Sequence, residues 1–179
     1  MNVLLLRPPR RGIWDLGLGV PPMGLAYIAA SLIRHGHRVQ ILDAYVQGWT
    51  WNRLQKWIAQ RRFDVLGLTV MTPTLDIAQR AIAMCRPFVD DIIVGGPHPT
   101  AIKHEIFHDL EGIDAAVVGE GEDVIIRWME YRKNGGSLPK GVLEKGQPFV
   151  SAPVPDIHSL PMPARHLLPN NQYRYIFST

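Results

Sequence analysis

The sequence predicts an α/β fold, a Rossmann-like (flavodoxin-like) doubly wound sheet of five parallel strands, over most of its 179 residues. Five short runs rich in Val, Ile and Leu recur along the chain, and segments with apolar residues at helical spacing separate them. The runs are mostly continuous rather than alternating, which is typical of parallel strands buried on both faces. The connections are short, as expected when helices pack back onto such a sheet.

Local residue types define the individual elements. The expected strands span residues 2–7, 39–42, 65–70, 92–94 and 115–118. The first helix opens at Pro21-Pro22 and closes at Gly36, because proline suits the first helical turn and glycine suits the residue after the last. Thr50 and Thr74 are expected to cap the second and third helices. A short helix is expected near residues 102–107.

The chain changes character near residue 138. Residues 1–138 form the expected α/β domain, and residues 139–179 follow it. Residues 142–144 and 149–150 flank a Lys-Gly-Gln sequence and predict a small hairpin. We interpret the remainder as an extended linker without a core of its own, because five prolines punctuate it: Pro153, Pro155, Pro161, Pro163 and Pro169.

Composition narrows the class of protein. With 46% hydrophobic and 20% charged residues, the chain has the balance of an ordinary globular domain. The net charge is +3 and the basic residues are mostly scattered, so we expect no nucleic-acid partner. No segment has the length and composition of a signal peptide or a membrane span. We therefore expect a cytoplasmic protein.

The loops after the strands are the expected binding region. In an open parallel sheet, ligands bind outside the carboxyl ends of the strands. This rule places residues 8–20, 71–74, 95–100 and 119–122 at one edge. These loops hold glycines, prolines and threonine hydroxyls but few charges, and a base, a nucleophile and an oxyanion donor cannot be assembled from them. The sequence therefore favours ligand binding over catalysis, with no catalytic residue and no protein metal ligand.

The loop after the fourth strand is the most informative. Gly95 and Gly96 carry no side chain, so the backbone there can lie against a bulky ligand, and Pro97 and Pro99 stiffen the adjoining turn. Two common functions of the fold are excluded. A dinucleotide site needs G-x-G-x-x-G after the first strand, and a phospho-acceptor receiver needs an aspartate where this third strand has Thr69.

Six motifs occur together along the chain: Arg7-Pro8-Pro9, PPMGLAYIAA at 21–30, ILDA at 41–44, GGPHPT at 95–100, GEGE at 119–122 and LPMPAR at 160–165. In combination they resemble the amino-terminal cobalamin-binding domain of radical S-adenosylmethionine enzymes. Anaerobic magnesium-protoporphyrin IX monomethyl ester cyclases and class B radical methyltransferases are examples of that family. The resemblance covers nearly the whole chain.

The resemblance implies a cobalamin cofactor held at the carboxyl edge of the sheet. Its nucleotide tail would descend into a crevice between strands, where Gly95 and Gly96 leave room. The hydroxyls of Thr69, Thr72 and Thr74 could then hydrogen-bond the phosphate or ribose of the tail, although a plain capping role is favoured for Thr74. The residues implied to contact the cofactor are Pro9, Arg10, Gly12, Thr69, Thr72, Pro73, Thr74, Gly95, Gly96, Pro97, His98, Gly119, Glu120 and Gly121.

One departure from the family concerns the lower face of the cobalt. Many cobalamin domains carry Asp-x-His-x-x-Gly after the first strand, and the same register here holds Arg7, Pro9 and Gly12. Because this histidine is absent, we expect a base-off cofactor with a weak or vacant lower face. A structural role is favoured for His98 over cobalt ligation, since the prolines on either side restrict it.

Three other side chains have simple interpretations. Glu120 and Glu122 precede a helix, where acids oppose the helix dipole, and contact with corrin amides is the alternative role. Cys85 lies on the apolar stripe of the third helix and is expected to be buried and inert. As the only cysteine, it excludes an internal disulfide.

In the parent enzyme, the resemblance implies a following barrel with a C-x-x-x-C-x-x-C motif, a [4Fe-4S] cluster and S-adenosylmethionine. The present sequence contains no such motif, so we expect a fragment that is inactive alone. The expected partners are that barrel in the same parent chain and a small-molecule substrate, and the expected reactions are methyl transfer or cyclisation. Two alternatives stay open: a cofactor-free structural or substrate-lid domain, and a nucleotide-sugar or anion-binding transferase domain that uses Arg10 and Arg11.

Overall fold

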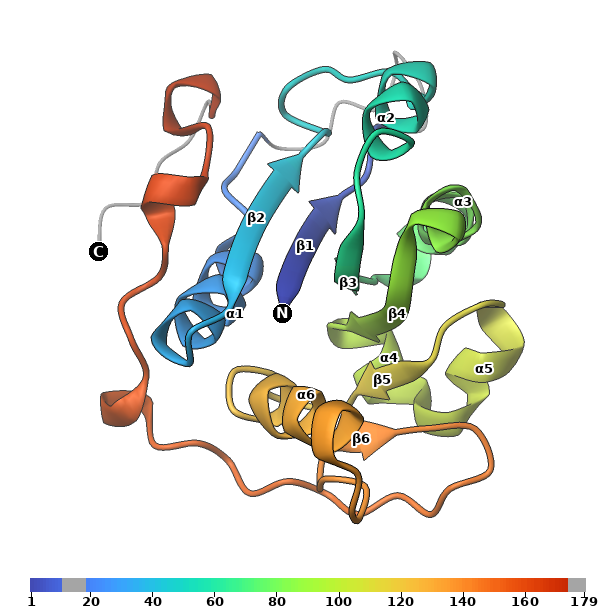
Figure 1. The fold of residues 1–179 in the computed structure, drawn as a ribbon, viewed down its shortest axis with the longest axis vertical. Helices are drawn as coiled ribbons and strands as arrows, with labels where there is room; N and C mark the ends of the chain where they lie inside the picture. The colour runs from blue at the N-terminus through green and yellow to red at the C-terminus, as the bar shows by residue number, and fades with distance from the viewer. Residues whose placement is uncertain (11–18, 174–179) are drawn as a thin grey trace.

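A six-stranded sheet with the order β2-β1-β3-β4-β5-β6 forms the centre of the computed structural model, which describes residues 1–10 and 19–173 (Figure 1). The strands are β1 (Asn2–Arg7), β2 (Arg38–Asp43), β3 (Phe63–Thr69), β4 (Val89–Gly95), β5 (Ala115–Val117) and β6 (Val142–Leu143). The first five are parallel, and β6 is antiparallel to β5. The predicted α/β class and its five parallel strands are confirmed, with one further strand added at the edge.

Helices cover both faces of the sheet. They are α1 (Met23–Arg34), α2 (Trp51–Ile58), α3 (Leu75–Cys85), α4 (Pro97–Ile102), α5 (Ile106–Asp109) and α6 (Val124–Asn134). Helices α1 and α6 bury their apolar residues against one face, and α2, α3 and α5 bury theirs against the other. In β1, Val3 and Leu5 join the first core and Leu4 and Leu6 join the second, which explains why this strand is apolar throughout.

The strand order reverses beside β1. The chain leaves β1 for β2 on one side and later returns to β3 on the other, so β1 pairs with both. Because the two crossovers run in opposite directions, the loops after β1 and β3 separate at the carboxyl edge. Ligands in this class of fold bind at such a point.

Several helix ends follow the sequence signals. Thr50 caps α2, since its hydroxyl accepts a hydrogen bond from the Arg53 backbone N–H over 3.2 Å. Gly36 follows α1 with a φ of +78°, as a helix-ending glycine does. The helix expected near residues 102–107 is part of a longer helical segment, α4 to α5, that begins at Pro97. Both prolines fit its first turn, where the backbone N–H groups have no partner within the helix, so they start a helix rather than only stiffening a turn.

The segment after residue 138 differs from the sequence expectation in one respect. Residues 142–143 form β6 against β5, and a single backbone hydrogen bond, from the Gly141 N–H to the Val150 carbonyl over 2.8 Å, connects them to the expected second arm. The β5 edge offers unpaired backbone groups to the chain that returns beside it. A strand pair with β5 therefore replaces the predicted hairpin.

The proline-rich tail lies along the outside of α1 and β2 (Figure 1). Three of its side chains, Ala164, Leu168 and Tyr173, are buried in the core on the α1 face, and the Ala164 backbone N–H donates to the Ala26 carbonyl over 3.0 Å. The tail has no separate core of its own, as expected, but it completes that of the α/β domain.

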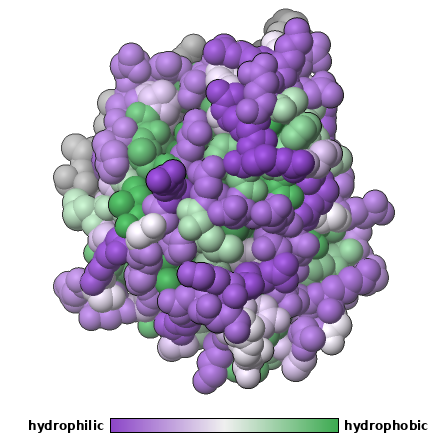
Figure 2. All heavy atoms as spheres, viewed as in Figure 1, coloured by the Kyte–Doolittle hydropathy of each residue, from purple (hydrophilic) through white to green (hydrophobic). Residues whose placement is uncertain are grey.

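Hydrophilic residues cover most of the face seen in Figure 1, and hydrophobic residues show as separate patches (Figure 2). This pattern is ordinary for a globular domain. Among the described residues, none of the helices combines the length and apolar character needed to cross a bilayer.

Candidate functional site

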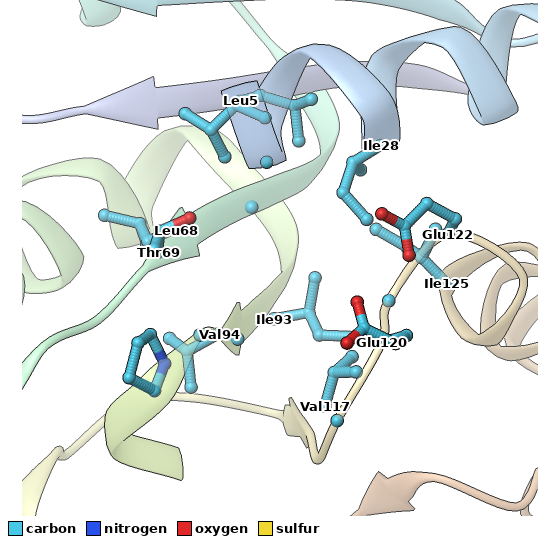
Figure 3. Close-up of a pocket in the computed structure, with 18 residues that line it drawn as sticks. Leu5, Ile28, Leu68, Thr69, Ile93, Val94, Val117, Glu120, Glu122 and Ile125 are labelled. Atoms are coloured by element: carbon cyan, nitrogen blue, oxygen red, sulfur yellow. The ribbon is translucent and has the colours of Figure 1, made fainter. Parts of the chain in front are cut away.

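A crevice of about 270 Å³ opens at the carboxyl edge of the sheet, between the strands and the two helices α1 and α6 (Figure 3). We call it the glycine crevice. It is lined by Leu5, Gly24, Leu25, Ile28, Gly67, Leu68, Thr69, Ile93, Val94, Gly95, Gly96, Pro97, Val117, Gly119, Glu120, Gly121, Glu122 and Ile125. Most of these residues are aliphatic or glycine, as in sites for apolar or aromatic ligands.

Strand register builds the floor of the crevice. Leu5, Gly67 and Ile93 lie side by side on three neighbouring strands, and Thr69 and Gly95 form the next row toward the edge. In each row a glycine stands where a side chain would otherwise project toward the helices. The Leu5 side chain covers Gly67, where a Cβ would lie 2.7 Å from the Leu5 Cδ2, whereas the space above Gly95 is open. The floor is therefore lowest at Gly95.

The adjacent glycines at the end of β4 serve different purposes. At Gly95, a Cβ would meet only the Val117 Cβ, at an ordinary 3.7 Å, so the space above it belongs to the crevice. At Gly96, φ is +104°, and a Cβ would lie 2.9 Å from the Thr69 Cγ2 and 3.1 Å from the Val70 carbonyl oxygen. Gly96 is therefore required by the backbone turn and its close packing.

The loop at residues 119–122 forms the side wall. Its approach to α1 depends on Gly121, where a Cβ would lie 2.9 Å from the Ile28 Cδ1. Glu120 and Glu122 both line the crevice, and their carboxylates are turned toward it (Figure 3). These two carboxylates give an otherwise apolar cavity an acidic side.

Glu122 is buried, with 9% of its surface exposed, and its Oε2 has no hydrogen-bond partner among the described residues. Burial raises the pKa of this carboxyl; hydrogen bonds from the backbone of Glu122 and Gly121 oppose the shift, and the charges of Glu120 and Asp123 add to it. The Asp123 side chain at the N-cap of α6 makes no capping hydrogen bond, and the expected interaction of Glu122 with the helix dipole stays a prediction.

A second cavity, of about 470 Å³, adjoins the glycine crevice and shares Gly24, Leu25 and Thr69 with it. Its other walls come from the loops after β1 and β3, including Pro9 and Thr74. Thr74 keeps its hydroxyl in a local turn, where it accepts from the Met71 N–H over 3.2 Å and donates to the Met71 carbonyl over 2.9 Å.

A hydrogen-bonded group fixes the strand ends beside this second cavity. Asp43 is fully buried and accepts from the Arg7 guanidinium over 3.3 Å and from the Tyr173 hydroxyl over 2.9 Å. Arg7 also donates to the Val20 carbonyl and lies over the Tyr45 ring. Arg7 is therefore engaged within the domain, although the resemblance aligned it with the cobalamin motif.

His98 lies in the first turn of α4 and is buried. One ring nitrogen, Nδ1, lies 3.0 Å from the Thr72 hydroxyl, and the other, Nε2, lies 2.9 Å from the Asp109 carboxylate. With both nitrogens engaged, the ring joins α4 to α5 and to the loop after β3. This geometry agrees with the structural role favoured from the sequence, and it also occupies Thr72.

The structure gathers about half of the predicted contact residues at one site. The glycine crevice includes Thr69, Gly95, Gly96, Pro97, Gly119, Glu120 and Gly121, and the second cavity includes Pro9, Thr69 and Thr74. Arg10, Thr72, Pro73 and His98 line neither cavity, and Gly12 falls outside the described residues. These contacts stay predictions.

Sequence reasoning missed several lining residues. Gly67 interrupts an apolar strand, a signal that marks close approach of a ligand or another backbone. Helical spacing places Ile28 on the core face of α1, yet it is only partly buried, and it borders the crevice. Glu122 has the sequence position of a helix-terminal acid, and nothing in its local sequence indicates burial.

No cluster of three or more His, Cys, Asp or Glu side chains suited to a metal ion occurs within residues 1–10 and 19–173. Cys85 is fully buried, which raises the pKa of its thiol to about 12. The apolar floor, the acidic side and the absent side chain at Gly95 fit the heteroaromatic base of a corrinoid nucleotide.

A doubly wound sheet with a glycine-walled crevice at its carboxyl edge places the chain in the class of open α/β domains, in which ligands bind at that edge. Within that class, the chain belongs to the B12 binding domain family, whose model matches residues 14–127. The resemblance found in the sequence is confirmed by this match.

Curated relatives are longer proteins. The chain is 30% identical over 186 residues to the uncharacterized methyltransferase PH0819 of Pyrococcus horikoshii, covering 97% of this chain and 40% of that protein. It is 29% identical over 130 residues to the anaerobic magnesium-protoporphyrin IX monomethyl ester cyclase of Rubrivivax gelatinosus, covering 70% of this chain and 23% of that protein. The chain thus spans less than half the length of either relative.

A solved structure confirms the fold. The cobalamin-dependent S-adenosylmethionine radical enzyme OxsB, with aqua-cobalamin and S-adenosylmethionine bound, matches with a TM-score of 0.73 and 18% identity. The match covers 93% of this chain and 24% of that one.

Proposed function

We propose that this chain is the cobalamin-binding module of a larger radical S-adenosylmethionine enzyme. The glycine crevice is the observation that carries the proposal, because it gives a member of the B12 binding domain family an apolar slot at the carboxyl edge of its sheet. A cavity of about 270 Å³ suits the base and ribose of the nucleotide arm. The corrin ring would remain outside, on the loops at the edge.

The described residues support a base-off cofactor. Pro9 takes the place of the axial histidine of the family motif, and both ring nitrogens of His98 are already hydrogen-bonded. When bound, cobalamin supplies a cobalt centre suited to carbon-group transfer. The residues of this chain bind the nucleotide arm, orient the cofactor and exclude water from the crevice.

The length of the relatives supports the proposal that the chemistry takes place outside this chain. Each of them is more than twice the length of the segment that matches this chain, so the proposed barrel, its [4Fe-4S] cluster and S-adenosylmethionine belong to the rest of the parent protein. Methyl transfer or cyclisation of a small-molecule substrate is then the proposed reaction. The module contributes cofactor placement to it.

Retention of hydroxocobalamin tests the proposal directly. The purified chain is mixed with excess hydroxocobalamin and desalted, and the visible absorbance of the protein fraction is recorded. We expect corrin bands close to one equivalent per chain. A colourless protein fraction would overturn the proposal and favour the cofactor-free structural domain.

A further inference from the structure

Glu122 has a feature that binding of a purely apolar group leaves unexplained. Its Oε2 is buried in the wall of the crevice with no hydrogen-bond partner among the described residues. A buried polar atom left unsatisfied costs about 1–3 kcal/mol, so such atoms are rare unless a ligand completes them. The structure thus contains a crevice-lining carboxyl with one buried oxygen that has no hydrogen-bond partner within the described part of the chain.

The surroundings of this oxygen select the kind of group that can satisfy it. Leu5, Ile28 and Ile93 surround the cavity with aliphatic surface, and Glu120 is the second carboxylate on the same wall (Figure 3). An anionic group such as a phosphate would be repelled by both acids. A flat apolar ring that carries one basic nitrogen satisfies the aliphatic surface and the oxygen together.

We propose that Glu122 recognises the lower base of the corrinoid, by sharing a proton between its Oε2 and the unsubstituted ring nitrogen of a benzimidazole-type base. The inference rests on the proposed function and adds a choice among cobamides to it. That nitrogen has a free lone pair only when it does not coordinate cobalt, so the contact also favours the base-off form. A phenolic lower base has no such nitrogen and cannot make the contact.

The protonation of Glu122 is consistent with this role. Its raised pKa, caused first by burial, keeps a larger fraction of the carboxyl protonated at a given pH, so that it can donate to a neutral ring nitrogen. A proton on either partner gives the same shared hydrogen bond, so no additional cation is required.

Three corrinoids test the inference: hydroxocobalamin, the p-cresolyl cobamide and cobinamide, which lacks the nucleotide. Affinities are measured by titration followed through the visible spectrum. We expect cobalamin to bind on the order of tenfold more tightly than the p-cresolyl form, as one hydrogen bond to an ionisable group provides. Cobinamide, which cannot fill the crevice, is expected to bind most weakly.

Variants assign the preference to one side chain. Glu122→Leu should bind the two cobamides equally, and Glu122→Gln should keep a weaker preference, because its amide N–H still donates to the ring nitrogen. Glu130→Leu is the matched control, because Glu130 is an exposed residue of α6 that lines neither cavity, and the preference should persist.

The outcomes distinguish the inference from the proposed function. Retention of none of the three corrinoids would overturn the proposed function, and the inference with it. Equal affinity of the wild-type chain for cobalamin and the p-cresolyl cobamide, or an unchanged preference in Glu122→Leu, would overturn the inference alone. The wild-type comparison needs no variant, so it holds even if a substitution disturbs folding.

Discussion

Gly95 is the residue through which the crevice can be closed with least disturbance to the fold. Its backbone has no positive φ, and an added Cβ would meet only the Val117 Cβ at 3.7 Å. Valine also suits a β-strand. A larger side chain here would fill the crevice from its floor.

We predict that Gly95→Val folds and loses cobalamin retention at least tenfold, with Gly95→Ala intermediate. Binding is measured by the desalting assay and folding by thermal unfolding. Asp90→Val, which adds the same side chain at the exposed, amino-terminal part of β4, is the control and should retain the cofactor. Full retention by Gly95→Val would show that the nucleotide arm lies elsewhere.

Glu122 makes the free energy of unfolding of the ligand-free domain depend on pH. Its carboxyl has a folded-state pKa above the ordinary value of 4.5, mainly because of burial. The folded state therefore binds this proton more tightly than the unfolded state. Its contribution to stability is fully present below pH 4.5 and is lost as the pH rises through the folded pKa.

We predict that Glu122→Gln is more stable than the wild type at pH 8, by on the order of 1 kcal/mol, because the buried charge is removed. The difference should shrink as the pH approaches 4. Urea unfolding across that range measures it. Glu120→Gln, at an exposed site, should stay within about 0.5 kcal/mol of the wild type. If Glu122→Gln were more stable than the wild type by the same amount at every pH, the difference could not come from the charge of Glu122.

At the scale of elements, the tail and the strand ends hold each other in place. Tyr173 is buried and donates to the fully buried Asp43 at the end of β2, and burial raises the pKa of its hydroxyl, so it remains protonated. Asp43 in turn orients Arg7 at the end of β1. The segment expected to be a linker thereby supports one edge of the candidate site.

We predict that Tyr173→Phe destabilises the domain by about 1–3 kcal/mol, because a buried carboxylate loses a hydrogen-bond donor. The midpoint of thermal unfolding should fall by roughly 2–4 °C per kcal/mol. Tyr131→Phe is the matched control, since that hydroxyl makes a longer 3.4 Å contact with Glu144. If the unfolding midpoint fell equally in both variants, the Tyr173 hydroxyl would add nothing specific, and the tail would contribute packing only.

The helices and strands also show which parts of the fold local sequence patterns can predict. Thr50, Gly36 and the apolar runs indicated helix and strand positions because their signals are local. Residues 142–144 were expected to form one arm of a hairpin, but their pairing with β5 was not predicted, because it depends on a free β5 edge that exists only in the folded sheet. The helix expected near residues 102–107 is present, but the helical segment before it, which begins at Pro97, was not predicted, because proline signals both a turn and a helix start.

For the whole molecule, the electronic state of the bound cofactor is the property that joins the fold to its proposed function. Pro9 stands at the family's histidine position, and Thr72 and Asp109 hold both nitrogens of His98. The described part of the chain thus offers cobalt no free imidazole at either position.

We predict that the Co(II) form of the bound cofactor gives an electron paramagnetic resonance spectrum without nitrogen superhyperfine splitting. His98→Ala should leave that spectrum unchanged, although it should destabilise the domain by removing two hydrogen bonds. Splitting from one nitrogen in the wild type would indicate an axial nitrogen ligand. Its loss in His98→Ala would then identify the histidine as that ligand.

The sequence by itself determined the fold class, the carboxyl edge as the binding edge and the glycine-rich loop after the fourth strand, because periodicity and turn chemistry are local properties. Tertiary structure alone decided that Gly95 faces the cavity while Gly96 serves the backbone, that His98 is held by Thr72 and Asp109, and that Glu122 is buried without a partner among the described residues. Those facts depend on which residues of distant strands and helices meet. Strand register and burial determine these contacts only once the whole sheet has formed.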